Sequence, residues 1–211
     1  MTATVHQPDN TTSEASFLGE VAEPSDAARA LFTEDQDDLG YVMNASRLWS
    51  HHPEAHEALF AVANLVTERA SLSMRDKGIL VTSAASTLGD SYCSLMWGKK
   101  LAELATPEFS AALLRGDDEP LDDRERTLAH WARQVTAEPN AIRAEDVQAL
   151  RDRGYEYAQI LAITCYVAVR IAIATVNDAL GARPDSQLRH TVPAAVLDAV
   201  QYGRRLRDTA S

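Results

Sequence analysis

The residues best suited to chemistry lie together within residues 82–101, where a carboxylate, a phenol and a thiol are close in sequence. Asp90 and Cys93 are three residues apart, so a helix places them one turn apart on the same face. In an apolar pocket, burial raises the pKa of a carboxyl group and makes that group a useful general base or acid. We therefore predict that Asp90 is the general base and that Tyr92 or Cys93 is the acid.

Asp90 and Cys93 also have structural interpretations. Asp90 follows Leu88-Gly89 and precedes an apolar-periodic run, which is typical of a helix N-cap that accepts the amide of Cys93. A capping carboxylate can still reach a ligand, so both roles stay open. A lone cysteine on an apolar helix face is usually a small buried hydrophobe. The helix N-terminus favours the Cys93 thiolate and an ionised Asp90 opposes it by a comparable amount, so we expect no net activation of the thiol.

Three residues are predicted to bind a substrate: Met96, Trp97 and Arg170. Met96 and Trp97 follow Cys93 on the same predicted helix and would add apolar walls to its pocket. Arg170 is the only charged residue between residues 160 and 176, so in a buried helix its guanidinium must find acceptors. It either forms an internal ion pair or holds an acidic substrate by a bidentate contact.

Three neighbouring histidines invite a metal site, because His52 and His56 are one helical turn apart and His51 is adjacent. Pro53 is typical of the first turn of a helix, so it places His52 before the helix and the two rings need not share a face. We expect a solvated helix start at these residues. No metal site and no cofactor are predicted.

Signals for helices follow one another along the chain, as cap residues, first-turn prolines and terminal glycines. No stretch alternates with the period of a strand, so the sequence predicts an all-α domain. The last predicted helix runs from residue 193 to residue 207. The predicted helices begin after Ser25, at Pro53, after Ser73, after Asp90, after Thr106, after Asp122, at Ala144, at Glu156 and at Pro193.

The longest predicted helix, residues 156–180, has apolar side chains on every face between residues 160 and 176. This pattern is typical of a helix that is buried all round. A membrane span is the alternative, but the run is slightly short and carries Arg170 near its middle. We expect a core helix around which a helical bundle packs.

The chain has 211 residues, enough for one domain with a substantial core, and a formal net charge of −11. This charge argues against nucleic-acid binding, because neutralising phosphates needs clustered Lys and Arg. Residues 1–16 are polar and are expected to be a disordered tail, which leaves residues 17–211 as a single domain with an extra helix from about residue 193. The first residues lack the apolar core of a signal peptide, and Cys93 and Cys165 form no disulfide framework. A cytoplasmic location is therefore expected.

Roughly residues 17–185 resemble the AhpD-like alkylhydroperoxidase and carboxymuconolactone decarboxylase superfamily, in its peroxidase-related branch. The resemblance rests on the order and spacing of three phrases, LGYVMNASRLWSHHPEAHEAL, PLDDRERTLAHWARQVTAEPNAIRAEDVQALRDRGYEYAQIL and NDALGARPD. It implies a helical domain that assembles into dimers, trimers or hexamers. It also implies small-molecule chemistry, because redox members reduce hydroperoxides with a dithiol and decarboxylase members use acid–base groups on a small lactone without a cofactor.

Most of the redox motif of the superfamily is absent here. Redox members carry a Glu and, twelve residues later, Cys-x-x-Cys-x-x-x-His; on this chain these fall on Gly78, Asp90 and, for the final His, Trp97. A His often found before the second Cys falls on Tyr92, and Cys93 alone remains. Reducing a peroxide needs a thiolate and a second thiol that resolves the sulfenic acid, so a dithiol peroxidase is not expected.

Three functions remain open. The first is a cofactor-free enzyme that carries out acid–base chemistry, such as decarboxylation, elimination, isomerisation or cyclisation, on a small organic molecule. The second is a single-thiol alkyl hydroperoxidase that uses Cys93 with an external reductant, and the third is a non-catalytic ligand-binding or assembly protein. Trp97 in place of a His enlarges the apolar wall of the pocket, which favours a bulky carbon substrate and hence the first function. We also expect a homo-oligomer, because the helical scaffold is apolar and members of the superfamily assemble.

Overall fold

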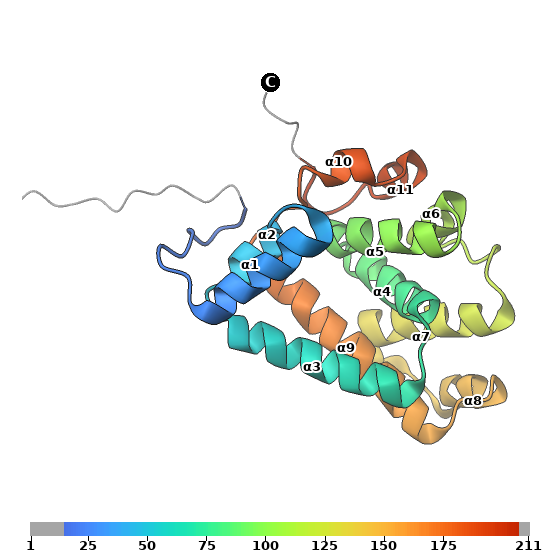
Figure 1. The fold of residues 1–211 in the computed structure, drawn as a ribbon. Helices are drawn as coiled ribbons and strands as arrows, with labels where there is room; N and C mark the ends of the chain where they lie inside the picture. Colours follow the sequence, from blue (N-terminus) through green and yellow to red (C-terminus); the bar gives the residue numbers. More distant parts are fainter. Residues whose placement is uncertain (1–14, 207–211) are drawn as a thin grey trace, which may run out of the picture.

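The computed structural model describes residues 15–206, and within them the chain forms α-helices, one short 3-10 helix and no strand (Figure 1). The predicted all-α fold is confirmed. The elements are α1 (Asp26–Leu39), α2 (Asn44–Trp49), α3 (Pro53–Ala70), α4 (Met74–Leu88), α5 (Ser91–Leu104), α6 (Pro107–Leu114), α7 (Asp123–Ala137), η1 (Pro139–Ala141), α8 (Ala144–Asp152), α9 (Tyr157–Ala179), α10 (Leu188–Thr191) and α11 (Ala194–Ala199).

Side-chain caps begin the helices where the sequence predicted them. The Ser25 side chain accepts the backbone N–H of Ala28, and the Thr106 side chain accepts that of Phe109. Gly40 ends α1 with a φ of 80°, a left-handed conformation that glycine adopts at little cost. Local hydrogen bonding therefore sets most of the helix boundaries in this fold.

The last helix is shorter than predicted. Instead of running from residue 193 to residue 207, α11 ends at Ala199, and the chain then turns through Gly203 at a φ of 67°. A Cβ atom on Gly203 would lie 2.7 Å from the carbonyl oxygen of Gly89. The segment after α11 is thus held tightly against the start of α5, a long-range contact that replaces helical continuation.

The ordered part of the chain begins earlier than predicted. Ala15 and Ser16, which were assigned to a disordered tail, are both buried. The backbone N–H of the next residue, Phe17, donates to the carbonyl of Leu180 at 2.8 Å, just beyond the end of α9. The rest of the predicted tail, residues 1–14, lies outside the described residues.

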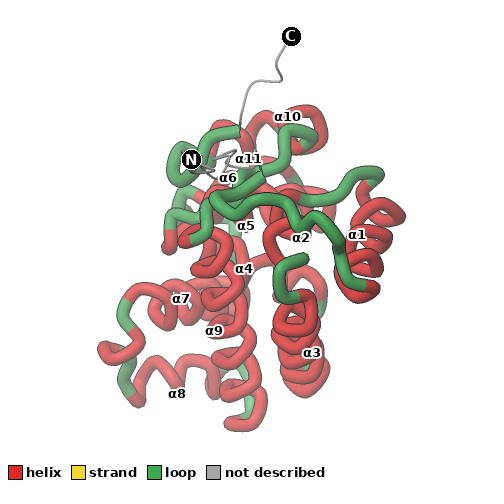
Figure 2. Tube along the Cα trace, turned by 90° about the vertical axis from the view of Figure 1, so that its left-hand side faces the viewer, coloured by secondary structure: helices red, strands yellow, loops and turns green. Residues whose placement is uncertain are grey.

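The long helix α9 packs against α3, α4 and α7, and α3 runs beside it (Figures 1 and 2). Ile163 and Val167 are almost completely buried, but Leu161 is 66% exposed and Ala168 and Ala172 are exposed too. The expectation that α9 is buried all round is therefore wrong, because the helices of this chain cover only part of its circumference. By length and composition α9 could also cross a membrane. Of its most apolar 18-residue stretch, 44% is buried inside the fold.

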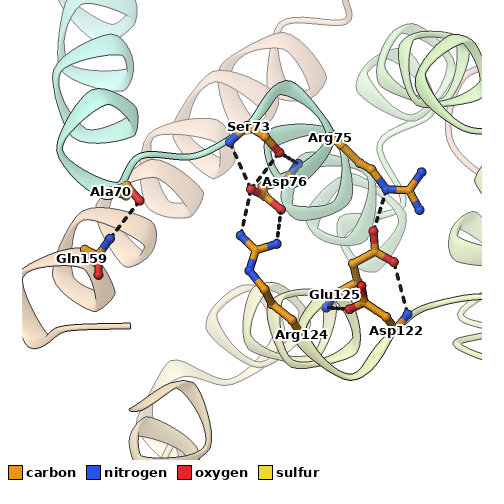
Figure 3. Close-up of polar contacts among 8 residues, drawn as sticks. All are labelled: Ala70, Ser73, Arg75, Asp76, Asp122, Arg124, Glu125 and Gln159. Carbon is orange, nitrogen blue, oxygen red and sulfur yellow. Dashed lines mark hydrogen bonds and ion pairs between the residues drawn. The ribbon is translucent and has the colours of Figure 1, made fainter. Parts of the chain in front are cut away.

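The start of α4 is tied to α7 by a buried carboxylate (Figure 3). Asp76 accepts hydrogen bonds from the backbone N–H and hydroxyl of Ser73, which closes a capping box, as the Ser73 hydroxyl accepts the N–H of Asp76. The same carboxylate accepts two N–H groups of Arg124 from α7, at 2.8 and 2.9 Å. Burial alone would raise the pKa of Asp76, but Arg124 and Ser73 outweigh it and hold that pKa below its usual range.

A reciprocal contact starts from α7, where the predicted capping box is confirmed (Figure 3). Asp122 accepts the N–H of Glu125, and Glu125 accepts the N–H of Asp122. The Glu125 carboxylate also accepts Nε–H of Arg75 from α4, at 2.6 Å. Each helix therefore stabilises its own N-terminus with a carboxylate that pairs with an arginine of the other helix.

Candidate functional site

Asp90 begins α5 and is fully buried. Its Oδ1 accepts the backbone N–H of Cys93 at 3.1 Å, so the predicted N-cap is confirmed, whereas its Oδ2 makes no hydrogen bond with the described residues. Burial raises the pKa of the Asp90 carboxyl, although the thiol and N–H groups beside it offset this in part. Asp90 thus combines a structural cap with an unpaired oxygen that can take up or release a proton.

Cys93 lies one turn further along, packed against Ala85 of α4 and Ala174 of α9. Burial raises the pKa of its thiol far above the usual range, and the Asp90 carboxylate raises it further. Arg170 opposes this shift, because its Nη2–H group donates to Sγ at 3.9 Å and favours the thiolate. The balance leaves the resting thiol protonated, in agreement with the expectation that Cys93 is not activated.

Arg170 is 8% exposed, and no carboxylate of the described residues forms an ion pair with it, although its charge lowers the pKa of the buried Asp90 carboxyl. Its Nε–H makes no hydrogen bond within residues 15–206. The guanidinium carbon lies 5.2 Å from the centre of the Trp97 ring and 5.8 Å from that of Phe60. Of the two predicted alternatives, the internal ion pair is therefore not found, and aromatic faces hold this cation instead. An unpaired buried charge is costly, so Arg170 is suited to an anion supplied by a ligand.

Tyr92 is not brought to the Cys93 thiol. Its hydroxyl donates to Asp185 at 2.6 Å and accepts the backbone N–H of Ala45, which ties α5 to the first turn of α2 and to the segment after α9. Its predicted role as an acid has no support from this position. Tyr166, one helical turn before Arg170 on α9, interacts electrostatically with both Arg170 and Cys93. Burial is the main cause that raises the pKa of Tyr166 to about 12.

A cleft of about 710 Å³ opens between α1 and α3, which lie beside each other in both views (Figures 1 and 2). His56 and Phe60 of α3 and Met96 of α5 line it, and Phe60 is also the ring that lies against Arg170. The cleft and the guanidinium thus share the Phe60 ring as a neighbour, and Arg170 itself does not line the cleft. A second cleft, of about 720 Å³ beside Arg75 and Phe109, is lined by none of the predicted site residues. The carboxylates that line the first cleft are Glu34, Asp35, Asp38 and Glu57.

His56, which was expected at a solvated helix start, lines the first cleft instead. His51 and His52 are exposed, as expected for a solvated helix start, but His56 is half-buried and its ring centre lies 4.4 Å from that of Phe60. Burial, and after it the charge of Arg170, lowers the pKa of His56 below its usual value. The one-turn spacing of His56 and Phe60 is visible in the sequence, but the cleft that both line is formed with α1 and α5.

The positions of the missing redox groups are filled by packing. A Cβ atom on Gly78, where the resemblance places a Glu, would lie 3.1 Å from a Leu101 methyl carbon, so this side of α4 has little room for a longer side chain. Cys165 and Cys93 form no disulfide with each other. Cys165 is partly exposed on α9, whereas Cys93 is buried and contacts Arg170.

The segment after α11 covers the start of α5 beside Asp90. The hydroxyl of Ser91 donates to the carbonyl of Arg204 at 2.7 Å, and Tyr202 donates to Ser94 at 3.0 Å. Arg204 also pairs with Asp178 at the end of α9. Burial, with a smaller contribution from the Asp90 charge, raises the pKa of Asp178 to about 6. Asp90 is thus covered on this side by residues 200–206, where the sequence predicted a helix that the structure does not form.

The fold is shared with solved structures of low sequence identity. A peroxidase-related protein with an AhpD core from Ralstonia eutropha JMP134 superposes with a TM-score of 0.75 at 19% identity, covering 83% of this chain and 95% of that one. A peroxidase-related protein from Silicibacter sp. TM1040 has the same TM-score and coverage at 22% identity. The debrominase Bmp8 superposes with a TM-score of 0.67 at 16% identity, covering 90% of this chain and 98% of its own.

These similarities show that the chain has the AhpD-like fold, as the resemblance in sequence implied. A structure of a cysteine-to-alanine variant of the debrominase, in complex with 2,3,4-tribromopyrrole, also superposes, with a TM-score of 0.66 at 16% identity. No family model matches the chain, and no curated protein matches its sequence significantly. The fold is therefore one that a small-molecule enzyme also uses.

Proposed function

We propose that this protein is a cofactor-free enzyme that carries out acid–base chemistry on a small, flat organic anion. The observation that carries the proposal is Arg170, a buried guanidinium that has aromatic neighbours and no carboxylate partner among residues 15–206. A protein gains no stability from a buried charge without a partner, so a ligand anion is the natural counter-charge. Arginine is also the side chain that best matches a carboxylate, through two parallel N–H donors.

The surroundings of Arg170 favour a flat and largely apolar ligand. Trp97 and Phe60 offer ring faces beside the guanidinium, and Met96 adds an adaptable thioether to the cleft. Phe60 lies between the cleft and Arg170, so a ligand must displace this ring or slide past it. The debrominase with the same fold was solved with a small halogenated pyrrole, which supports a ligand of this size and shape.

Asp90 is the proposed proton-transfer group. With the ligand anion held by Arg170, an ionised Asp90 would use its free Oδ2 to take a proton from a carbon or oxygen of the ligand. The electron pair left on the ligand would be stabilised by the guanidinium, and the nearby Cys93 thiol would return a proton to it. Isomerisation follows from these two transfers, and the cycle closes when Asp90 passes its proton to the Cys93 thiolate. Elimination would also release a leaving group from the ligand, cyclisation would form a new ring bond, and decarboxylation would release CO₂ before the proton is returned.

The single-thiol hydroperoxidase is the second candidate, and the contact between Arg170 and Cys93 favours it. At 3.9 Å the guanidinium would stabilise a Cys93 thiolate once formed. Burial and Asp90 oppose formation of the thiolate, so we rank this function below acid–base chemistry. A non-catalytic binding protein would share the Arg170 site but would not depend on the charge of Asp90.

A cytoplasmic location and a homo-oligomeric state belong to the same proposal. They fit a small-molecule enzyme with this fold, and the exposed apolar side of α9 offers a surface for assembly.

The proposal is tested by binding of benzoate, a flat aromatic carboxylate, with benzamide as its uncharged analogue. Benzoate should raise the melting temperature and benzamide should not, because only the carboxylate supplies a charge for Arg170. At ten times its Kd, benzoate should stabilise the protein by about 1.4 kcal/mol. Calorimetric titration gives the affinity itself.

Arg170→Met should abolish benzoate binding without weakening the fold. Methionine keeps an apolar stem of similar length and removes an unpaired buried charge, so the variant should be at least as stable as the wild type. Arg115→Met is the matched control, since Arg115 is exposed and away from the cleft. Equal binding of benzoate and benzamide, or unchanged binding by Arg170→Met, would show that Arg170 is not an anion site.

A further inference from the structure

His56 lines the cleft, and its ring nitrogens make no hydrogen bond with residues 15–206. The imidazole packs on the Phe60 ring with centres 4.4 Å apart and on Trp49 with centres 5.6 Å apart, so both of these contacts are made by ring faces and edges. The cleft that His56 lines shares the Phe60 ring with the proposed anion site. A free imidazole nitrogen at the wall of a ligand cleft can accept a proton from a ligand or from water.

Phe60 connects His56 to Arg170. One of its contacts is with the imidazole, and another is with the guanidinium, whose carbon lies 5.8 Å from the ring centre. A fixed positive charge beside the same ring opposes a second positive charge on His56, and the apolar surroundings strengthen the effect. The pKa of His56 is accordingly lowered, by burial first and by Arg170 second.

Other charged groups face the same space, and they do not reverse this balance. The neighbouring side chains from α2 and α5, Trp49 and Met96, carry no charge. The carboxylates would favour protonated His56, yet the net shift is downward. They are Glu34, Asp35 and Asp38 from α1 and Glu57 from α3 itself.

We propose that His56 is a second acid–base residue of this site, neutral while the site is empty and protonated when an organic anion neutralises Arg170. The inference rests on the proposed function for the presence of that anion. When the proton comes from the ligand, a C–H or O–H bond of the ligand breaks and the proton is transferred to the free imidazole nitrogen. The electron pair of that bond stays on the ligand beside Arg170. Binding and proton uptake are thereby coupled, so that the base acquires its strength only in the complex.

The test is an NMR titration of the histidine rings, with His56→Gln used to assign the His56 signals. In the empty protein His56 should titrate below the ordinary histidine range. With saturating benzoate, its proton affinity should rise roughly five- to tenfold, as expected for the loss of one nearby charge. Arg170→Met should produce the same rise without any ligand, and benzoate should then add nothing. The ring signals of the exposed His52 serve as the internal reference of these spectra.

Proton uptake gives a second readout, because calorimetry in two buffers of different ionisation enthalpy reports the protons taken up on binding. Wild type at about pH 6.5 should take up a fraction of a proton with benzoate, and His56→Gln should take up none. If benzoate fails to bind, the anion site is wrong, and the Arg170→Met titration still decides whether the two charges are coupled. Benzoate that binds through Arg170 while His56 keeps its proton affinity would overturn the inference and leave the proposed function standing.

Discussion

Asp90 holds the first turn of α5 together and is also the proposed base, so the two roles must be separated by experiment. Asn caps a helix about as well as Asp, and Asp90→Asn therefore keeps the contact to the N–H of Cys93 while removing the charge. We expect this substitution to lower turnover of the natural substrate by roughly a hundredfold, the usual scale of a lost general base. Turnover is measured alongside thermal unfolding.

The pH dependence of stability gives Asp90→Asn a readout that needs no substrate. Because burial raises the pKa of Asp90 in the folded protein above its ordinary value of 3.8, the ionised carboxylate costs stability at neutral pH. That cost disappears as the pH falls through the raised pKa towards 3.8, where the folded and unfolded states are both protonated. The variant should thus melt at or above the wild-type temperature at about pH 7, and the difference should vanish near about pH 4.

Two further variants separate the candidate functions. Asp90→Ala should lose about 0.5–2 kcal/mol of stability, as expected when a cap is removed. Cys93→Ser keeps a hydroxyl that can still return a proton to the ligand, so it should lower acid–base turnover only in part, whereas it would abolish a single-thiol peroxidase. Normal turnover by Asp90→Asn would reduce Asp90 to a cap and move the chemistry elsewhere.

The roles of some of these residues could be predicted from neighbouring residues in the sequence, and those of others could not. Asp90 was identifiable because a cap depends on residues three positions apart in sequence. The lack of an ion pair at Arg170 was not, since it depends on which side chains of the helices around α9 reach the guanidinium, and no carboxylate of residues 15–206 does. The place of His56 in the cleft was not predicted for a similar reason, because its surroundings are brought together by three other helices.

At the scale of single helices, the paired N-termini of α4 and α7 lead to a stability prediction. Asp76→Asn should destabilise the protein by about 2–3 kcal/mol, because it weakens both a capping contact and a two-pronged contact to Arg124. Urea unfolding at neutral pH measures the loss. The wild-type advantage should be present above the ordinary Asp pKa of 3.8 and be lost as the pH falls through the lowered pKa of the folded state.

Arg126→Met is the matched control for this contact. Arg126 pairs with Asp123 on the same helix, but both side chains are largely exposed, at 44% and 68%. Such a pair contributes little, but Arg126 also donates to the backbone carbonyl of Leu121 at 2.8 Å, so the loss should stay within about 1.5 kcal/mol, below that expected for Asp76→Asn. Equal effects of Asp76→Asn and Arg126→Met would mean that burial of the Asp76 carboxylate does not strengthen its contacts.

Helix ends were predictable wherever a cap or a terminal glycine set them, and less so where contacts between distant segments did. Ser25, Thr106 and Asp122 are caps at the predicted places, because each satisfies backbone groups of its own helix. The end of α11 was placed wrongly. Its continuation is replaced by a turn at Gly203, which packs on the start of α5, and no local pattern encodes that contact.

At the scale of the whole molecule, residues 15–206 leave one apolar surface of the central helix uncovered. Leu161, Cys165, Ala168 and Ala172 follow one another at spacings of four, three and four residues, so they share one face of α9. Leu161 is 66% exposed, Cys165 is partly exposed, and both alanines are exposed. This regular spacing is that of a helix–helix seam, and small residues at its centre allow two backbones to approach closely. A second copy can present the same face across a two-fold axis, which is the commonest way for identical chains to assemble.

We therefore predict a homo-oligomer held through this face of α9. Light scattering at micromolar concentration should give at least twice the chain mass of 23.0 kDa. Ala168→Glu places a charge at the middle of the face and should yield a folded monomer, because burying two unpaired carboxylates at a two-fold contact is very costly. Leu104→Glu is the control, since Leu104 is 40% exposed at the end of α5 and lies outside the face. A wild-type mass near 23.0 kDa would rule out assembly, and an Ala168→Glu oligomer would place the contact on another surface.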